Sequence, residues 1–330
     1  MTFEHRFPYK WTLAEANFTK DKGKVFSCFS CGGGSTMGYK LAGFDVIGCN
    51  EIDQKMMKCY KINHDPKYAF LEPIQTFKDR LDLPDELYQL DILDGSPPCS
   101  SFSMAGNRSD DWGKEKIFRE GQAEQVLDTL FFDFIDLAKK LQPKVVIAEN
   151  VEGLLFGEAR SYVRKIYTEF DKAGYYCQHW LLDSSEMGVP QVRRRIFFIC
   201  LRKDLADPFL YQADMFTVMP KLNVEFNESE ISFKSFGTMA ETHQDKKTVL
   251  TAERFYEKCK KGESFSTVSG GSFFNWCRLD PDKATPTLHT ETRMMYHPEI
   301  MRPVNKKECC MISSFPLDYD FIDINYSIIV

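Results

Sequence analysis

The chain has 330 residues, a formal net charge of −6 and eleven cysteines. This length is typical of about two domains, and the composition is that of a soluble globular protein. Residues 1–24 do not resemble a signal peptide, no apolar run approaches the ~20 residues that span a bilayer, and the odd number of scattered cysteines indicates reduced thiols. We therefore expect a cytoplasmic protein with no membrane partner. The negative charge leaves nucleic-acid binding open, because that depends on a local basic face.

The first predicted elements form a strand–helix–strand unit. They are a strand at residues 24–29, a turn at Gly32-Gly33-Gly34, a helix at 37–43 and a strand at 44–50 that ends at Glu51. Glycines let a ligand approach the backbone, and a carboxylate 19 residues further on can hydrogen-bond ribose hydroxyls. This order indicates a nucleotide-binding site, more strongly than the glycine turn would alone.

Two cysteine-containing stretches bear on chemistry. Cys28 and Cys31 form a CxxC pair, but a zinc site needs a second pair and the sequence has none, so we predict no metal site. Cys99 follows a short apolar strand at residues 90–93 and a turn with two prolines. Because the prolines fix two φ angles, the turn presents the thiol rigidly, as a nucleophile requires. The alternative is a stiff loop with an incidental buried thiol.

Helices and strands alternate through the middle of the chain. The predicted elements are a helix and polar loop at 54–80, a mobile lid at 100–121, a helix at 125–141, a buried parallel strand at 145–148 and an amphipathic helix at 163–172. Ligands bind beyond the carboxyl ends of strands in open parallel sheets. Glu51, Cys99 and Glu149 each follow a predicted strand, so we expect them to converge at one edge. Taken alone, Glu149 would fit a capping or solvated carboxylate equally well.

Three consecutive arginines, Arg193 to Arg195, lead into an apolar strand predicted at residues 196–200. Arginines beside a buried strand are costly unless they face anions or hydrogen-bond acceptors. The alternation of a strand directs Arg193 and Arg195 to one side and Arg194 to the other. The alternative is a basic surface patch.

The chain changes character after about residue 204, where the alternation of strands and helices stops. Residues 245–261 contain six basic and three acidic side chains. This local excess fits either a solvated helix face or a surface that contacts phosphates. Residues 305–316 return to helical periodicity.

Several motifs resemble those of the DNA cytosine-5 methyltransferases, in the family's order and over almost the whole chain. The most specific are Pro98-Cys99-x-x-Phe102-Ser103, Glu149-Asn150-Val151 and Gln191-x-Arg193-x-Arg195. The others are Phe29 to Gly34 with Glu51, Thr129-Leu130-Phe131, Arg278 to Leu288, and Arg302 to Pro316. Any one of these motifs would be weak evidence, and their common order makes the resemblance strong.

The resemblance implies an α/β fold, with a Rossmann-like S-adenosylmethionine-dependent methyltransferase sheet and a smaller target-recognition domain. We expect a catalytic and cofactor-binding domain at 1–204, a target-recognition domain at 205–285, and a return segment at 286–330 that packs on the catalytic domain. The implied activity is sequence-specific cytosine-5 methylation of double-stranded DNA, of restriction–modification or phage type. We expect a monomer, with a cognate restriction endonuclease as a candidate partner.

The resemblance also implies roles for individual residues. Cys99 would attack C6 of a flipped cytosine, Glu149 would assist at N3, and Arg195 with Arg193 would hold the O2 edge. The cofactor would be S-adenosyl-L-methionine and the product S-adenosyl-L-homocysteine. The residues implied in cofactor binding are Phe29, Ser30, Gly32, Gly33, Gly34, Ser35, Thr36, Met37, Glu51, Ile52, Ile74, Ser96, Pro98 and Leu130.

Three positions depart from the family pattern. Cys31 stands where the family usually has glycine, and Pro73 stands where it usually has an aspartate near the adenine. The tenth motif normally continues into a Gly-Asn-Ser-Val-like element, and the sequence reaches Val330 where that element is expected. All three departures fall in motifs that the resemblance links to cofactor binding.

Two other functions are compatible with parts of the sequence. The first is a tRNA cytosine-5 methyltransferase of the same superfamily, although the Cys-Phe-Thr signature associated with that branch is not found. The second is a catalytically silent relative that binds DNA or cofactor. The presence of Cys99, Glu149 and Arg195 argues against the silent relative.

Overall fold

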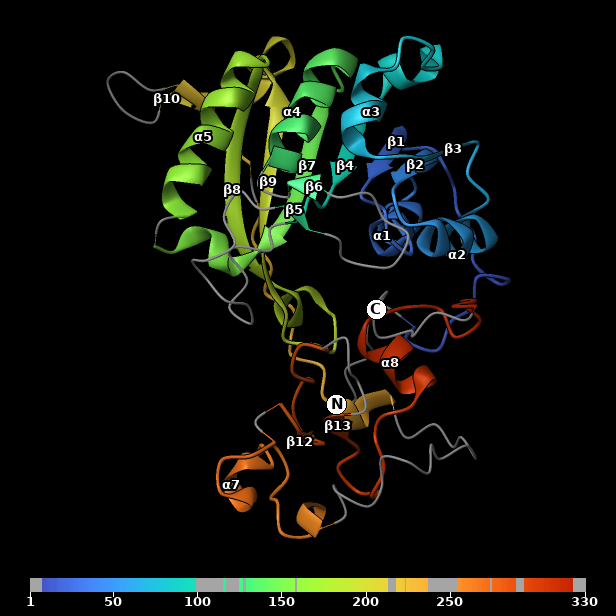
Figure 1. Cartoon of the computed structure of the whole chain (residues 1–330), viewed down its shortest axis with the longest axis vertical. Helices are drawn as coiled ribbons and strands as arrows, with labels where there is room; N and C mark the ends of the chain where they lie inside the picture. The colour runs from blue at the N-terminus through green and yellow to red at the C-terminus, as the bar shows by residue number, and fades with distance from the viewer. Residues whose placement is uncertain are drawn as a thin grey trace. The chain divides into compact units, whose positions relative to one another are not determined.

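The computed structural model describes residues 8–98, 115–116, 125–126, 129–157, 159–212, 218–222, 224–236, 254–273, 275–288 and 294–322. The chain forms two compact units (Figure 1). The larger unit consists of Asn17–Leu182 and Arg194–Glu225, and the smaller unit of Met1–Ala16, Asp183–Arg193 and Phe226–Val330. The units therefore interleave along the chain.

The larger unit is built on a mixed sheet of seven strands in the described part of the chain. In spatial order these are β3 (Tyr68–Leu71), β2 (Asp45–Glu51), β1 (Lys24–Cys28), β4 (Ile92–Gly95), β7 (Val145–Val151), β9 (Arg194–Arg202) and β8 (Tyr175–Asp183). The pairs from β3 to β7 are parallel, whereas β7 and β9 are antiparallel. The apolar runs in the sequence become these strands because both faces of the sheet are covered.

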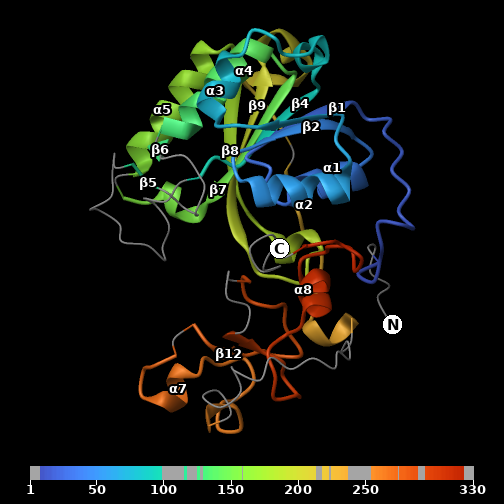
Figure 2. The ribbon, with the colours of Figure 1, turned by 45° about the vertical axis from the view of Figure 1, so that its right-hand side comes forward.

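Helices cover the two faces of the sheet (Figure 2). One face carries α3 (Ile74–Asp79), α4 (Leu130–Leu141) and α5 (Ala159–Lys172), and the other carries α1 (Gly34–Leu41) and α2 (Gln54–His64). The main core contains Phe26 and Phe198 from the sheet and Phe134 and Phe170 from the helices, each 0% exposed. Alternation along β1 places Val25 and Ser27 on the opposite face, toward α1.

Short segments complete the larger unit. They are η1 (Asp85–Gln89), β5 (Glu115–Lys116), β6 (Gln125–Val126), η4 (Glu152–Leu155), η6 (Lys203–Leu205), η7 (Asp207–Phe209), β10 (Leu210–Gln212) and β11 (Val218–Pro220). β5 with β6, and β10 with β11, form antiparallel pairs.

The smaller unit contains short elements joined by buried polar contacts. Its elements are η5 (Ser184–Met187), η8 (Phe233–Phe236), α7 (Ser266–Ser269), β12 (Cys277–Arg278), β13 (Met295–Tyr296) and α8 (Lys306–Ile312). Both guanidinium nitrogens Nη1 and Nη2 of Arg302 donate to the fully buried Glu308 carboxylate at 2.7 Å. Asn305 and Glu308 form a capping box that fixes the start of α8.

Two motifs distant in the sequence meet inside the smaller unit. Gln191, 3% exposed, forms a β-bridge with Thr285, and its Oε1 accepts from the Leu288 backbone N–H at 3.4 Å. Its Nε2 donates to Ser313 at 3.2 Å. The Gln-x-Arg-x-Arg motif is therefore tied at its first residue to the Pro-Thr-Leu motif.

The structure corrects parts of the sequence prediction. The region 54–80 contains β3 and α3 in addition to α2, so the predicted polar loop was wrong; both elements are too short for a clear periodic signal. The helix predicted from residue 125 begins at Leu130, and Gln125–Val126 forms a strand. The lid at 100–121 lies outside the described residues apart from Glu115–Lys116.

The compact units divide the chain at positions other than the predicted domain limits. Residues 205–225 cluster with the sheet, and the segment from residue 226 onward clusters with the smaller unit. The functions expected for 1–204, 205–285 and 286–330 stay predictions. No helix in the described part of the chain has both the length and the apolarity to cross a bilayer.

Candidate active site

The carboxyl ends of the parallel strands are in register. Gly95 at the end of β4 pairs with Cys28 of β1 and with Ala148 of β7. The residues that follow these three positions are Phe29, Ser96 and Glu149. The sheet therefore delivers the glycine loop, the proline turn and the Glu-Asn-Val motif to one edge. This confirms the expected convergence of Glu149 with the strand end that leads to Cys99, and Asn50, which precedes Glu51, pairs with Cys28 at the same edge.

The turn after β4 is held from both sides. Ser96 Oγ donates to the Phe29 carbonyl at 3.3 Å, and Asn150 Nδ2 donates to the Pro97 carbonyl at 3.0 Å. Gly95 is required where the turn begins, because a Cβ there would lie 2.6 Å from the Phe134 ring. Cys99 lies outside the described residues, and the exposed Pro98 is the last described residue before it. These contacts hold the strand end from which Cys99 follows.

Glu149 and Arg195 form an ion pair beside this turn. Arg195 Nε lies 3.0 Å from Glu149 Oε1, and the two side chains are 20% and 30% exposed. The antiparallel pairing of β7 with β9 creates the contact, because Arg195 lies opposite Val151 and its side chain reaches back. Arg194 pairs with Glu152 at 3.1 Å, so the two arginines contact different acids.

Arg193 belongs to the smaller unit. Its backbone N–H donates to Asp183 Oδ1 at 3.3 Å, and its carbonyl accepts from Ser184 N–H at 3.2 Å. Arg193 thus marks the point where the chain passes from one unit to the other, and its predicted role at the base stays a prediction.

Glu51 organises the glycine loop. Its Oε2 accepts from Cys31 N–H at 2.7 Å, and its Oε1 accepts from the N–H groups of Ile52 and Asp53, each at 2.9 Å. Burial raises the pKa of Glu51, and these backbone hydrogen bonds oppose the rise. Three donors occupy three of the roughly four acceptor positions of a carboxylate. Within the described chain, one position on Oε2 stays available to a ligand hydroxyl.

The loop adopts left-handed backbone conformations at Phe29, Cys31 and Gly33, with φ of 52°, 47° and 91°. A Cβ at Gly33 would lie 2.2 Å from His64 Nε2, so the ring of His64 packs directly under the loop. Burial, together with the charge of Lys40, lowers the pKa of His64 to about 3, and the ring is neutral at physiological pH. A single histidine at the end of a helix has no distinguishing pattern, so His64 was missed in the sequence.

The predicted cofactor residues differ in accessibility. Ser35, Ser96 and Pro98 are exposed, whereas Phe29, Gly34 and Ile52 are half-buried. Ile74 and Leu130 lie in the hydrophobic core at 2% and 1% exposure. The remaining buried members are Ser30, Gly32, Gly33, Thr36, Met37 and Glu51. The exposed and half-buried residues can contact a ligand, whereas Ile74 and Leu130 pack in the core beneath the site.

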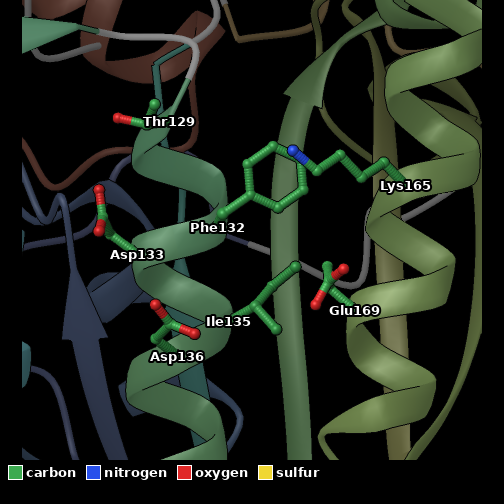
Figure 3. A pocket seen from close by; sticks show the side chains of 7 residues that line it. All are labelled: Thr129, Phe132, Asp133, Ile135, Asp136, Lys165 and Glu169. Carbon is green, nitrogen blue, oxygen red and sulfur yellow. The ribbon is translucent and has the colours of Figure 1, made fainter.

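A cavity of about 350 Å³ lies between α4 and α5. Figure 3 shows Phe132 of α4 beside Lys165 of α5, whose Nζ lies 4.2 Å from the ring centroid. The cavity is lined by Thr129, Phe132, Asp133, Ile135, Asp136, Lys165 and Glu169. It lies in the helical layer, and its lining includes none of the predicted site residues that the structure describes.

The sequence of the chain matches a known protein family over most of its length. A family model described as C-5 cytosine-specific DNA methylase matches residues 23–328. The chain belongs to this family. The Type II methyltransferase M.FnuDI of Fusobacterium nucleatum is 37% identical over 186 residues, which are 55% of this chain and 48% of that protein. The chain thus spans about half the length of that relative.

Two further similarities cover more of the chain. The Type II methyltransferase M.Sau96I of Staphylococcus aureus is 30% identical over 342 residues, covering 96% of this chain and 74% of that protein. A crystal structure of a Spodoptera frugiperda DNMT2 mutant matches with a TM-score of 0.57 at 17% identity, covering 93% of this chain and 97% of that one. The structural match shows that the fold is the α/β methyltransferase fold.

Proposed function

We propose that this C-5 cytosine-specific DNA methylase family member is a sequence-specific DNA cytosine-5 methyltransferase that uses S-adenosylmethionine. The observation that carries the proposal is the Glu149–Arg195 pair beside the turn that leads to Cys99. The Glu149–Arg195 pair, the turn and the glycine loop lie within one compact unit, at one edge of its sheet. The sequence similarity to type II methyltransferases supports the same activity.

The proposed chemistry begins at Cys99. Its thiolate forms a bond to cytosine C6, and the electron pair of the C5–C6 double bond moves onto C5. C5 then takes a methyl group, a base removes the C5 proton, and re-formation of the double bond expels the thiolate. When bound, S-adenosylmethionine supplies that methyl group on an electrophilic sulfonium.

Glu149 and Arg195 recognise the base in this proposal. Glu149 lies one residue before Asn150, which holds the proline turn, so its distance from the turn is fixed by the backbone. In its protonated form the Glu149 carboxyl donates a hydrogen bond to N3, which draws electron density from the ring and assists attack at C6. The arriving base competes with Glu149 for Arg195, which then reaches the O2 edge. Glu149 and Arg195 thus form an ion pair in the absence of the base, and each contacts the base separately when it is bound.

The glycine loop fits the adenosyl part of the cofactor. The loop is held in shape at Gly33, which is buried and where a side chain would collide with His64. The remaining acceptor position of Glu51 suits a ribose hydroxyl. Ile52 and Ser96 flank these groups and are accessible. The donor set therefore suits a nucleoside, and the departure at Cys31 leaves its backbone N–H bonded to Glu51.

Double-stranded DNA is the proposed substrate, and its target cytosine must leave the helix to reach Cys99. We propose that target recognition resides in the smaller unit, between residue 226 and about residue 285. Arg278 shapes this segment: its Nε donates to the Pro298 carbonyl at 3.0 Å and its guanidinium lies 4.2 Å from the Tyr256 ring. Arg278 thus holds the backbone of the segment together and leaves other side chains to read DNA.

The test is transfer of a labelled methyl group from S-adenosylmethionine to genomic duplex DNA and, separately, to tRNA. The proposal expects label in DNA that is absent with Cys99→Ser, and no label in tRNA. Label in tRNA alone would show that the protein is a tRNA methyltransferase of the same superfamily. Binding of S-adenosylhomocysteine without transfer to either substrate would identify a silent relative.

A further inference from the structure

The carboxylate of Asp94 is buried at the end of β4, and the chemistry above does not use it. It is 6% exposed. Its Oδ2 accepts from Ser27 Oγ at 2.8 Å and from Ser35 Oγ at 2.7 Å, and its Oδ1 accepts from Tyr39 OH at 3.2 Å. Ser27 lies directly opposite Asp94 on β1, whereas Ser35 and Tyr39 come from α1. The acid therefore joins two strand ends to the helix that follows the glycine loop.

This arrangement carries a cost in stability. Burial raises the pKa of Asp94 to about 6, with a further contribution from the charge of Glu149, while the three hydroxyl donors oppose the rise. A neutral asparagine would make a similar link between β1, β4 and α1 without burying a charge. A buried ionisable group that destabilises the fold and lies at a ligand-binding edge is a candidate for a functional role.

Ser35 connects this buried charge to the solvent. Its side chain is exposed, and its hydroxyl proton points inward to Asp94. The oxygen of Ser35 therefore presents lone pairs outward and can accept a hydrogen bond from a ligand. The first turn of α1 contains no acidic residue, and the N-terminus of a helix disfavours cations. Asp94 supplies the negative charge that a cationic ligand group would need at this position.

We propose that Asp94 acts through Ser35 as the positioning residue for the α-ammonium group of S-adenosylmethionine. This inference rests on the proposed function, because it places that cofactor at the glycine loop. The ammonium group donates hydrogen bonds, whereas the sulfonium group has no hydrogen to donate, so Ser35 selects the former. S-adenosylhomocysteine retains the ammonium group, and 5′-methylthioadenosine lacks the whole amino-acid part.

Calorimetric titration of the full chain with these two probes at pH 7.5 tests the proposal. Asp94→Asn should weaken S-adenosylhomocysteine binding about tenfold, the value of one charge-assisted hydrogen bond, and change 5′-methylthioadenosine binding by less than about twofold. Tyr39→Phe is the matched control, because it removes the longest of the three hydrogen bonds and keeps the charge. It should leave both affinities within about twofold of the wild type.

The pH dependence gives a second readout. Wild-type affinity for S-adenosylhomocysteine should fall as pH drops below about 6, and the Asp94→Asn variant should show a smaller fall, because Glu51, whose pKa burial also raises, titrates in both proteins. Among the groups that face Asp94, burial raises the pKa values of Cys28, Tyr39 and Tyr60, so these stay neutral between pH 5 and 8. Glu149 is the other acid, and Glu149→Gln should keep the response.

The outcomes separate the two proposals. If the wild type does not bind S-adenosylhomocysteine, the proposed function fails together with the inference. A second case is that the wild type binds S-adenosylhomocysteine and Asp94→Asn changes the affinity for both probes equally or not at all. The role of Asp94 is then overturned while the proposed function stands. If Asp94→Asn does not fold, Ser35→Ala takes its place, and it should weaken binding of S-adenosylhomocysteine more than binding of 5′-methylthioadenosine. If Ser35→Ala changes both affinities equally or not at all, the proposed role is overturned.

Discussion

Replacement of Gly33 by alanine tests the geometry of the glycine loop. Gly33 has a φ of 91° and caps the start of α1. An L-residue in this region costs about 1–2 kcal/mol. The new Cβ would lie 2.2 Å from His64 Nε2 and 3.1 Å from Tyr60, and both of these residues are buried. Displacing packed side chains adds about 1–3 kcal/mol, so we expect Gly33→Ala to lower the free energy of unfolding by about 2–5 kcal/mol.

Urea denaturation, followed by tryptophan fluorescence, measures this effect. Gly38→Ala is the matched control, because Gly38 lies inside α1 and a Cβ there meets nothing within 4 Å among the described residues. It should raise the free energy of unfolding by about 0.5–1 kcal/mol. The two variants should therefore move the midpoint in opposite directions at similar slopes. A Gly33→Ala midpoint equal to or above that of the wild type would refute the loop geometry.

Three further predictions concern buried groups. The pKa of Asp94 is raised from 3.8 to about 6, so the native state loses stability as pH rises through that range, by at most about 3 kcal/mol. Asp94→Asn should therefore stabilise the protein against urea at pH 7.5 and have little effect at pH 4. Equal effects at the two pH values would contradict this. Arg302→Ala leaves the buried Glu308 carboxylate unpaired and should cost about 3–5 kcal/mol by thermal unfolding, whereas a loss below about 1 kcal/mol would show that the pair is not buried. Cys31→Gly should stabilise by about 0.5–1 kcal/mol, because φ of 47° favours glycine, and destabilisation in urea would contradict the conformation.

The sequence predicted the elements that carry strong local signals. The strand before the glycine turn, the helix after it and the strand that ends at Glu51 are found within one to three residues of the predicted limits. The convergence of the strand that leads to Cys99 with Glu149 is confirmed by the register of β4 and β7. Both features follow from parallel pairing, which places all carboxyl ends at one edge.

Other features depend on contacts that a sequence does not display. The Glu149–Arg195 ion pair arises from the antiparallel pairing of β7 with β9, which no local pattern specifies. Asp94 and His64 become notable only because tertiary packing buries them. The division of the chain at residue 226 depends on long-range clustering, which a change in composition along the sequence does not display.

Bisulfite sequencing tests the central claim most directly. DNA would be taken from cells that lack cytosine-5 methylation of their own and that express either the wild-type chain or the Cys99→Ser variant. Our account predicts protected cytosines at one recurring sequence with the wild type and none with the variant. Complete conversion of all cytosines with a folded wild-type chain, or equal protection with Cys99→Ser, would contradict it.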